Sequence, residues 1–169
     1  MLRVDPLRNP EPLIRRVYAY VAYRIGAGPD AEDVTSETFE RALRYRKSYD
    51  PSKGEPLAWL IGIARRLIEG RPLHPALAWD LPDRADAGDL EDAAVRRLAL
   101  SDAVGQLDER DRELIALRYG ADLTARQIAE TLELRTNAVE VALHRALGRL
   151  RSALEEPDDP PVRKHGTAR

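Results

Sequence analysis

Along most of this chain, apolar residues recur at every third or fourth position, which is the spacing of one buried helical face. The first part contains three such segments, and we expect helices at about residues 13–25, 30–47 and 55–69. The stretch from Gly26 to Pro29 should end the first helix, and Asp30 is placed to cap the second. Turn residues at 49–54 separate the second helix from the third. Together the three helices predict a small N-terminal bundle.

The apolar positions of these helices form the candidate core of that bundle. They are Leu13, Val17, Val21 and Ile25 in the first helix, Val34, Phe39, Ala42 and Leu43 in the second, and Leu57, Leu60, Ile61, Ala64 and Ile68 in the third. Residues 1–12 contain three prolines and are expected to be an irregular lead-in.

A second group of helical segments resumes near Leu90 and ends near Leu154. Within it, Thr124 and Gln127 have the spacing of a capping box, in which the two side chains satisfy free amides at the start of a helix. After a tight turn the last helix follows, with an apolar stripe at Val139, Leu143, Leu147, Leu150 and Leu154. A short helix, a tight turn and a longer helix predict a helix-turn-helix, whose second helix fits a DNA major groove.

Polar residues beside that stripe favour DNA binding over a plain packing role for the helix-turn-helix. Arg and Asn side chains can form bidentate hydrogen bonds with base edges, and Arg also pairs with phosphates. The residues concerned are Arg135, Thr136, Asn137, His144, Arg145, Arg149 and Arg151.

Sustained alternation of β-branched residues is missing, so the predicted fold class is all-α, with two small helical domains joined by a flexible linker. We place the domains at residues 1–71 and 98–155, an acidic, proline-containing linker at 72–97, and a disordered tail at 156–169. Domains of this size have modest cores, which suggests that they depend on a larger partner for stability.

Composition limits the function classes further. The 169 residues carry a net charge of −2, although a protein that binds DNA by charge alone is usually basic, so a larger partner is expected to supply much of the affinity. The chain has no cysteine and no apolar run that resembles a signal peptide or membrane span, so we expect a soluble, cytoplasmic protein without membrane insertion. The three histidines are isolated, and phosphate-loop and nucleophile motifs are missing. No metal, cofactor, catalytic residue or enzymatic activity is predicted.

Motifs in both halves, taken in this order, resemble the bacterial RNA polymerase sigma factors of the extracytoplasmic-function (ECF) type, within the sigma-70 family. In the front half the resemblance rests on residues 30–34, 37–42, 49–54 and 58–65, and in the rear half on residues 107–119, 127–129 and 143–150. It implies a subunit that directs core polymerase to specific promoters and helps to open the DNA.

The resemblance also implies a role for each surface. The second front helix would bind the polymerase clamp through Asp30, Asp33, Glu37, Glu40 and Arg41. The third front helix and the loop before it would bind the minus-ten element and its melted strand through Lys53, Trp59, Arg65, Arg66 and Arg71, although Trp59 also fits a packing role. The helix-turn-helix would contact the polymerase flap, and would read the minus-thirty-five element through Thr124, Arg126, Gln127, Arg135, Thr136, Asn137, Ala138, Glu140, Val141, His144 and Arg145. An anti-sigma factor that clamps the two domains is a further expected partner.

Several positions depart from the family pattern. Glu140 and Ala142 stand where basic residues are frequent, Arg66 stands where Asn is frequent, and Arg135 replaces the small N-cap, which leaves Thr136 or Asn137 to cap the last helix. Two alternatives therefore stay open: a sigma-like protein that binds polymerase without independent promoter recognition, and a conventional helix-turn-helix regulator.

Overall fold

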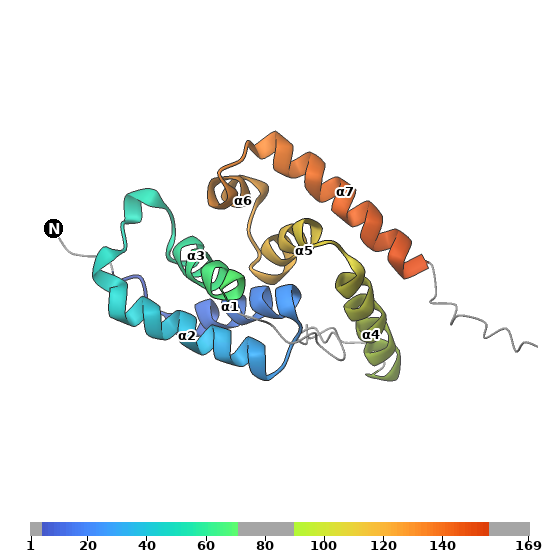
Figure 1. The fold of residues 1–169 in the computed structure, drawn as a ribbon, viewed down its shortest axis with the longest axis horizontal. Coiled ribbons are helices and arrows are strands. Elements are labelled where there is room, and N and C mark those ends of the chain that lie inside the picture. Colours follow the sequence, from blue (N-terminus) through green and yellow to red (C-terminus); the bar gives the residue numbers. More distant parts are fainter. Residues whose placement is uncertain (1–4, 71–89, 156–169) are drawn as a thin grey trace, which may run out of the picture.

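The computed structural model describes residues 5–70 and 90–155, with side chains of the second range described from residue 95 onward. Within these ranges the chain is helical and has no strand. The N-terminal unit consists of α1 (Pro10–Ile25), α2 (Pro29–Tyr45) and α3 (Pro56–Glu69), with short 3-10 turns η1 (Arg46–Ser48) and η2 (Pro51–Lys53) between α2 and α3. The C-terminal unit consists of α4 (Leu90–Gln106), α5 (Glu109–Ile115), the π-helical turn η3 (Ala116–Gly120), α6 (Ala125–Leu132) and α7 (Thr136–Glu155). Figure 1 shows α1 between the rest of its own unit and α5 of the other.

Proline explains where the first two helices begin. Pro10 and Pro29 lie at the starts of α1 and α2, where a missing amide costs nothing and the fixed φ suits the helix. The expected lead-in is therefore too long, since α1 already begins at Pro10. The prediction that Asp30 caps α2 is also wrong: Gly28 occupies the N-cap, and Asp30 lies in the first turn, where its charge favours the helix dipole.

The core of the N-terminal unit follows the predicted apolar faces except at three positions, of which the first, Leu13 of α1, is only half-buried. Val17, Val21 and Val34 are fully buried, and every predicted position of α3 is buried. Leu43 of α2 was expected in this core, but 56% of it is exposed, and Phe39 is only half-buried.

The C-terminal unit differs from expectation at its start. The helix α4 begins at Leu90, inside the range predicted as linker, so residues 90–97 are helical. At its other end, Arg112 of α5 donates hydrogen bonds to the carbonyl oxygens of Gly105 and Leu107, at 2.8 and 2.6 Å, and so satisfies acceptors near the end of α4. The rest of the predicted linker and the tail, with Arg71, His74 and His165, lie outside the described residues.

The two units pack against each other through α1, a contact that the sequence did not predict. One continuous cluster of buried residues runs from Val17 and Tyr20 of α1 to Leu117 and Leu123 of the C-terminal unit. The contact is closest at Gly120, where a Cβ atom would lie 2.8 Å from the Cα of Tyr20. Only glycine fits a backbone approach of this kind.

The two residues that follow the turn η3 offer backbone acceptors to the N-terminal unit. The Ala121 amide donates a 2.9 Å hydrogen bond to the carbonyl of Ala116, five positions earlier, whereas an α-helical amide donates to the carbonyl four positions earlier. The carbonyl oxygens of Ala121 and Asp122 accept hydrogen bonds from the Arg16 guanidinium at 2.7 and 2.9 Å. In the described part of the chain, no helix is both long enough and apolar enough to cross a bilayer.

Candidate nucleic-acid interface

The helix-turn-helix comprises α6, a tight turn and α7. The predicted capping box is present: the Gln127 amide donates to the Thr124 hydroxyl at 3.2 Å, and the Thr124 amide donates to the Gln127 side-chain oxygen at 2.9 Å. Glu133 ends α6 in the left-handed conformation, with φ of 56°. The next helix, α7, then begins at Thr136, which leaves Arg135 at the N-cap position.

The predicted recognition residues share one exposed face of α7. Val139, Leu143 and Ala146 turn inward and fix the rotation of the helix, so the positions between them face outward. We call the following exposed residues the recognition face: Arg135, Thr136, Asn137, Ala138, Glu140, Val141, His144 and Arg145. Thr124 and Arg126 of the preceding helix segment are also exposed, and Gln127 is half-buried.

Arg149 has a structural partner, which the sequence did not reveal. Its guanidinium forms a bidentate ion pair with Asp111 of α5, with one contact from Nη2 to Oδ1 of 2.7 Å. The hydrogen bond with Asp111 raises the pKa of Arg149. Asp111 itself is 3% exposed. Arg149 therefore holds α7 against α5, a role that the sequence did not predict, and 55% of its side chain is exposed.

The loop before α3 and the start of that helix form one wall of a groove with a volume of about 710 Å³. Tyr49 and Trp59 lie on this wall with ring centroids 5.4 Å apart, and the Tyr49 hydroxyl donates to the Gly54 carbonyl at 2.9 Å. Lys53 also lines it. Trp59 is half-buried, so it both packs against Tyr49 and faces the groove.

The opposite wall of this interdomain groove belongs to α6. Arg126, Gln127 and Thr131 line it, and the Gln127 side chain donates a 3.4 Å hydrogen bond to Glu55 across the groove. The predicted minus-ten surface and part of the predicted minus-thirty-five surface thus face each other across the groove.

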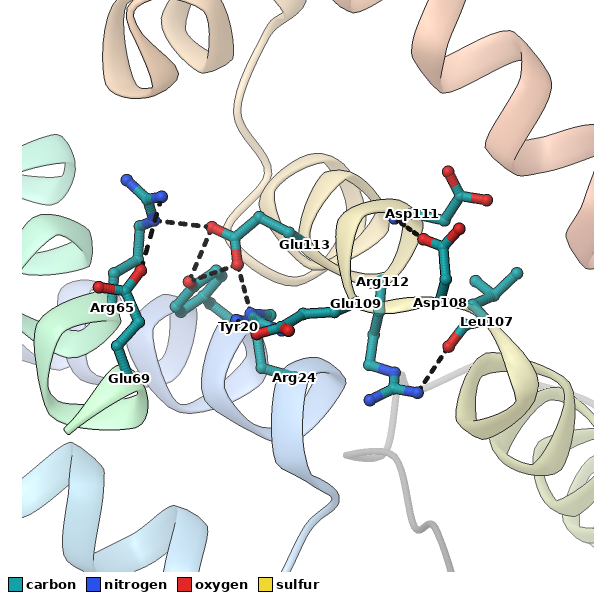
Figure 2. A network of polar contacts seen from close by, with 10 residues as sticks. All are labelled: Tyr20, Arg24, Arg65, Glu69, Leu107, Asp108, Glu109, Asp111, Arg112 and Glu113. Carbon is teal, nitrogen blue, oxygen red and sulfur yellow. Dashed lines mark hydrogen bonds and ion pairs between the residues drawn. The ribbon is translucent and has the colours of Figure 1, made fainter. Parts of the chain in front are cut away.

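A cluster of polar side chains connects the two units deeper in the molecule (Figure 2). Glu113 of α5 accepts hydrogen bonds from the Tyr20 hydroxyl at 3.0 and 3.1 Å, and pairs with Arg24 and with Arg65, the latter at 3.0 Å. We call Tyr20, Arg24, Arg65 and Glu113 the interdomain cluster. It joins α1, α3 and α5.

Burial changes the pKa values of the side chains in the interdomain cluster. Tyr20 is fully buried and Arg24 is 6% exposed. Burial, and then the negative charge of Glu113, raise the pKa of Tyr20 well above its usual range. Burial alone would lower the pKa of Arg24, but the charge of Glu113, together with Tyr20 and the hydrogen bond to Glu109, more than offsets this, so the pKa of Arg24 is raised. The cluster thus keeps Arg24 charged and Tyr20 neutral.

Comparison with known proteins identifies the two units. Residues 11–69 match the family described as Sigma-70 region 2, and residues 97–150 match Sigma-70, region 4. This chain belongs to the sigma-70 family, in its ECF group. Helices α1 to α3 are its region 2, and α4 to α7 are its region 4.

Curated relatives carry the ECF designation. The sigma factor BldN of Streptomyces coelicolor is 32% identical over 152 residues, which cover 85% of this chain and 57% of BldN. SigK of Mycobacterium ulcerans is 26% identical over 83% of this chain and 80% of its own length. SigL of Mycobacterium tuberculosis (strain H37Rv) is 29% identical, with 83% of each chain covered. This sigma factor thus spans little more than half the length of BldN but most of SigK and SigL.

Two solved structures share the fold. The sigma factor RpoE of Bartonella quintana, in complex with the anti-sigma factor NepR, has a TM-score of 0.66 at 17% identity, over 85% of this chain and 92% of RpoE. CnrH, in complex with the cytosolic domain of CnrY, has a TM-score of 0.58 at 25% identity, over 88% of this chain and 83% of CnrH. The all-α architecture of two helical regions is confirmed by these matches.

The predicted residues of region 2 lie on two surfaces of this sigma factor. On α2, Asp33, Glu40 and Arg41 are exposed, Asp30 and Glu37 are half-buried, and the Arg41 Nη2 lies 2.7 Å from a Glu37 carboxylate oxygen. On α3, Arg66 is exposed, whereas Arg65 is taken up by Glu113 of region 4. In the described residues, no group of acidic and histidine side chains is arranged to hold a metal ion.

Two exposed apolar side chains on α2 were not predicted from the sequence. Leu43 and Tyr45 are 56% and 55% exposed. Leu43 lies three positions after Glu40 and Tyr45 lies four positions after Arg41, so each is a neighbour of one predicted clamp-binding residue on the helix surface. Because Leu43 was predicted to lie in the core, its exposure on the surface of α2 was not expected.

Proposed function

We propose that this protein is a promoter-specificity subunit, which binds core RNA polymerase and directs it to chosen promoters. The observation that carries the proposal is the presence, in one chain, of region 2 and of a region 4 with a capped helix-turn-helix and an outward recognition face. Such a subunit positions DNA and traps unpaired bases, and the polymerase performs the chemistry. Because it works with polymerase, its place is the cytoplasm.

The recognition face is proposed to read the minus-thirty-five element. Arg135, Asn137 and Arg145 supply donors for base edges and phosphates, and the exposed Val141 can contact a thymine methyl group. Glu140 can accept a hydrogen bond from a cytosine amine, but it repels phosphates. The recognition face is therefore expected to favour certain bases but to bind DNA weakly. Binding of region 4 to the polymerase flap is proposed to supply the remaining affinity of the complex for the promoter.

The groove wall in region 2 is proposed to bind the minus-ten element. An aromatic pair such as Tyr49 and Trp59 offers a ring face on which an unpaired base can stack. Lys53 and the exposed Arg66 supply positive charge beside it for the strand's phosphates, and Arg65 joins them once released from Glu113.

The outer surface of α2 is proposed to bind the polymerase clamp. It combines the charged Asp33, Glu40 and Arg41 with the exposed Leu43 and Tyr45. An apolar side chain within a polar surround is typical of a protein interface. An anti-sigma factor is a further proposed partner, since the similar RpoE was solved in complex with the anti-sigma factor NepR.

Run-off transcription on a library of genomic fragments tests the proposal. Purified sigma factor and core polymerase should together produce discrete transcripts that neither produces alone. Arg145→Ala should weaken every one of them, whereas Arg15→Ala, an exposed arginine of α1 that belongs to none of the proposed surfaces, should not.

Failure of the transcription assay would distinguish the alternatives. A stable complex with core polymerase that starts no transcript would indicate a polymerase-binding protein without promoter recognition. Tight binding to duplex DNA without polymerase would indicate a conventional regulator. The match to region 2 does not favour that last outcome.

A further inference from the structure

We propose that Asp111 and Arg149 are positioning residues for promoter recognition: their ion pair sets the direction in which α7 presents the recognition face, and Arg149 does not itself bind DNA. The inference deepens the proposed function and rests on it, because it assigns base reading to the recognition face. It adds two side chains that lie outside that face, and one of them is a buried carboxylate.

The ion pair joins α5 to the last helix of region 4. Asp111 lies in the first turn of α5 and is 3% exposed, and both of its carboxylate oxygens contact the Arg149 guanidinium, one of them at 2.7 Å. A bidentate pair fixes the orientation of the guanidinium plane as well as its distance. The aliphatic side chains that bury the same helix, Val139, Leu143 and Leu150, pack without a preferred direction.

The carboxylate of Asp111 is held in place by its own helix. The Asp108 side chain accepts a 2.8 Å hydrogen bond from the Asp111 amide and caps α5, where the helix dipole favours negative charge. The next residue, Arg112, donates hydrogen bonds to carbonyl oxygens near the end of α4. Figure 2 shows Asp108, Asp111 and Arg112 around the start of α5. Consecutive residues of α5 therefore hold α4 and α7, so the ion pair ties α7 to a fixed point.

The place of Arg149 on α7 argues against a direct contact with bases. At about 1.5 Å per residue it lies about 20 Å along the helix from Thr136, whereas a recognition helix reads base edges with residues near its N-terminus. Although 55% of the Arg149 side chain is exposed, its guanidinium is directed at Asp111. A guanidinium bound to a carboxylate is not available to a phosphate in the same geometry.

Beyond its apolar packing, α7 is held at two points, which makes its direction sensitive to the ion pair. The tight turn after α6 fixes where α7 begins, and the pair with Asp111 holds the helix about 20 Å further along. A tilt of about 5° around the first point would displace Arg145, about 14 Å along the helix, by about 1.2 Å. Binding groups must be held to within about 0.5 Å of their working geometry. Loss of the pair should therefore weaken base discrimination without removing a DNA contact.

Two substitutions break the pair from opposite sides. Asp111→Asn keeps the size of a side chain that is too buried to touch DNA, and it removes a negative charge from the protein. Arg149→Met removes the positive charge and keeps the length of the side chain. If the two residues acted through net charge alone, Asp111→Asn would strengthen DNA binding and Arg149→Met would weaken it. A positioning role predicts instead that both variants lose discrimination between promoter sequences.

Competition binding with the holoenzyme measures discrimination. The probe is a promoter fragment that yields a transcript in the run-off assay, and the competitors are copies with one base pair changed in the minus-thirty-five element. We expect the wild type to prefer the intact promoter by about tenfold, and both variants by about threefold or less. Arg15→Met is the matched control and should keep the wild-type preference, because Arg15 is exposed on α1 outside every proposed surface. The preference is a ratio, so partial loss of active protein does not alter it.

Three further measurements separate positioning from a direct contact. Arg149→Met should leave the slope of log K against log salt unchanged, whereas loss of a residue that binds a phosphate lowers the slope by about 0.9. The double variant should discriminate as well as either single variant, because two residues of one ion pair act together. Arg149→Lys, which keeps the charge but loses the bidentate geometry, should recover part of the preference.

A distance measurement in the free full-length chain tests positioning without DNA or polymerase. Cysteines introduced at Asp102 of α4 and Ser152 of α7, both exposed, carry spin labels for electron paramagnetic resonance, since the chain has no cysteine of its own. We expect one narrow distance distribution in the otherwise wild-type protein and a broader one in Asp111→Asn and Arg149→Met. Circular dichroism of each variant reports whether its helices are retained.

The outcomes separate this inference from the proposed function. A salt slope lowered by Arg149→Met, a preference that survives both substitutions, or an unchanged distance distribution would overturn the positioning role while transcription still supports a sigma factor. A broadened distribution, in a protein that yields no transcript with core polymerase, would retain the positioning of α7 and overturn promoter recognition. If Asp111→Asn loses its helices, the two Arg149 variants still decide, because that side chain is more than half exposed.

Discussion

Replacing Glu113 with Gln should destabilise the protein more than any other single change of one carboxylate in region 4. The substitution keeps the size of the side chain but leaves Arg24, which is 6% exposed, without its buried counter-ion. Removing one partner of a buried ion pair typically costs about 3–5 kcal/mol, because the remaining charge is uncompensated. The pair with Arg65 adds less than about 1 kcal/mol, since Arg65 is 30% exposed and water screens it. We expect a loss of about 3 kcal/mol.

Urea unfolding followed by circular dichroism measures the lost free energy of unfolding. In thermal unfolding of a chain of this length, a loss of about 3 kcal/mol should lower Tm by roughly 6–12 °C. Glu109→Gln is the matched control: Glu109 lies on the same helix and also pairs with Arg24, at 3.4 Å, but its side chain is 80% exposed. It should cost less than about 1 kcal/mol.

A rescue variant tests the cause of the loss. Replacing both partners, as Arg24→Met with Glu113→Leu, removes the uncompensated charge and should recover much of the stability. The reasoning is refuted if Glu113→Gln costs no more than Glu109→Gln, because burial of Glu113 would then carry no energetic weight.

The remaining predictions concern alkaline pH, the capping box and DNA affinity. Because the pKa of Tyr20 is raised in the folded protein, the unfolded chain loses its proton first, so stability should fall as pH rises above about 10. Unfolding curves of Tyr20→Phe should lack that part of the slope, and an identical slope would exclude Tyr20 as its source. Thr124→Ala should cost about 1 kcal/mol in urea unfolding through loss of the N-cap, while Thr136→Ala on α7 reports the cost of a threonine that is not part of this box. Arg145→Ala should reduce the slope of log K against log salt for holoenzyme on promoter DNA by about 0.9, if Arg145 binds a phosphate; an unchanged slope assigns it to a base or to solvent. Glu140→Gln should raise the holoenzyme's affinity for promoter DNA in a filter-binding assay, and a fall in affinity would show that the carboxylate accepts a hydrogen bond from a base.

Local periodicity was enough to predict the helices and most of the core. The buried positions of α3, from Leu57 to Ile68, follow the helical repeat without exception, and the Thr124 capping box depends on residues only three apart. Leu43 was misplaced because a helical repeat marks the side of a helix and not which neighbour covers it. Here nothing in the described structure covers that part of α2.

Contacts between distant segments could not be predicted in the same way. Tyr20 and Glu113 are separated by 93 positions, and a single sequence gives no indication that they meet. The same holds for Arg149 and Asp111, which are 38 positions apart and whose ion pair the sequence did not predict. Exposure of the recognition face follows from the helical repeat of α7, but the bases that it contacts remain a prediction.

The wide turn η3 has a consequence for insertions and deletions. Each residue of an α-helix advances the chain by about 100° around its axis. Loss of one residue between Ala116 and Gly120, with the wide turn retained, would shorten the chain by one such step. It would also swing everything that follows, α6 and α7 included, by about a quarter of a revolution relative to α1. The number of residues in this turn therefore determines the direction in which the recognition face of region 4 points. An insertion or deletion in the turn would change the orientation of α6 and α7 more than most substitutions would.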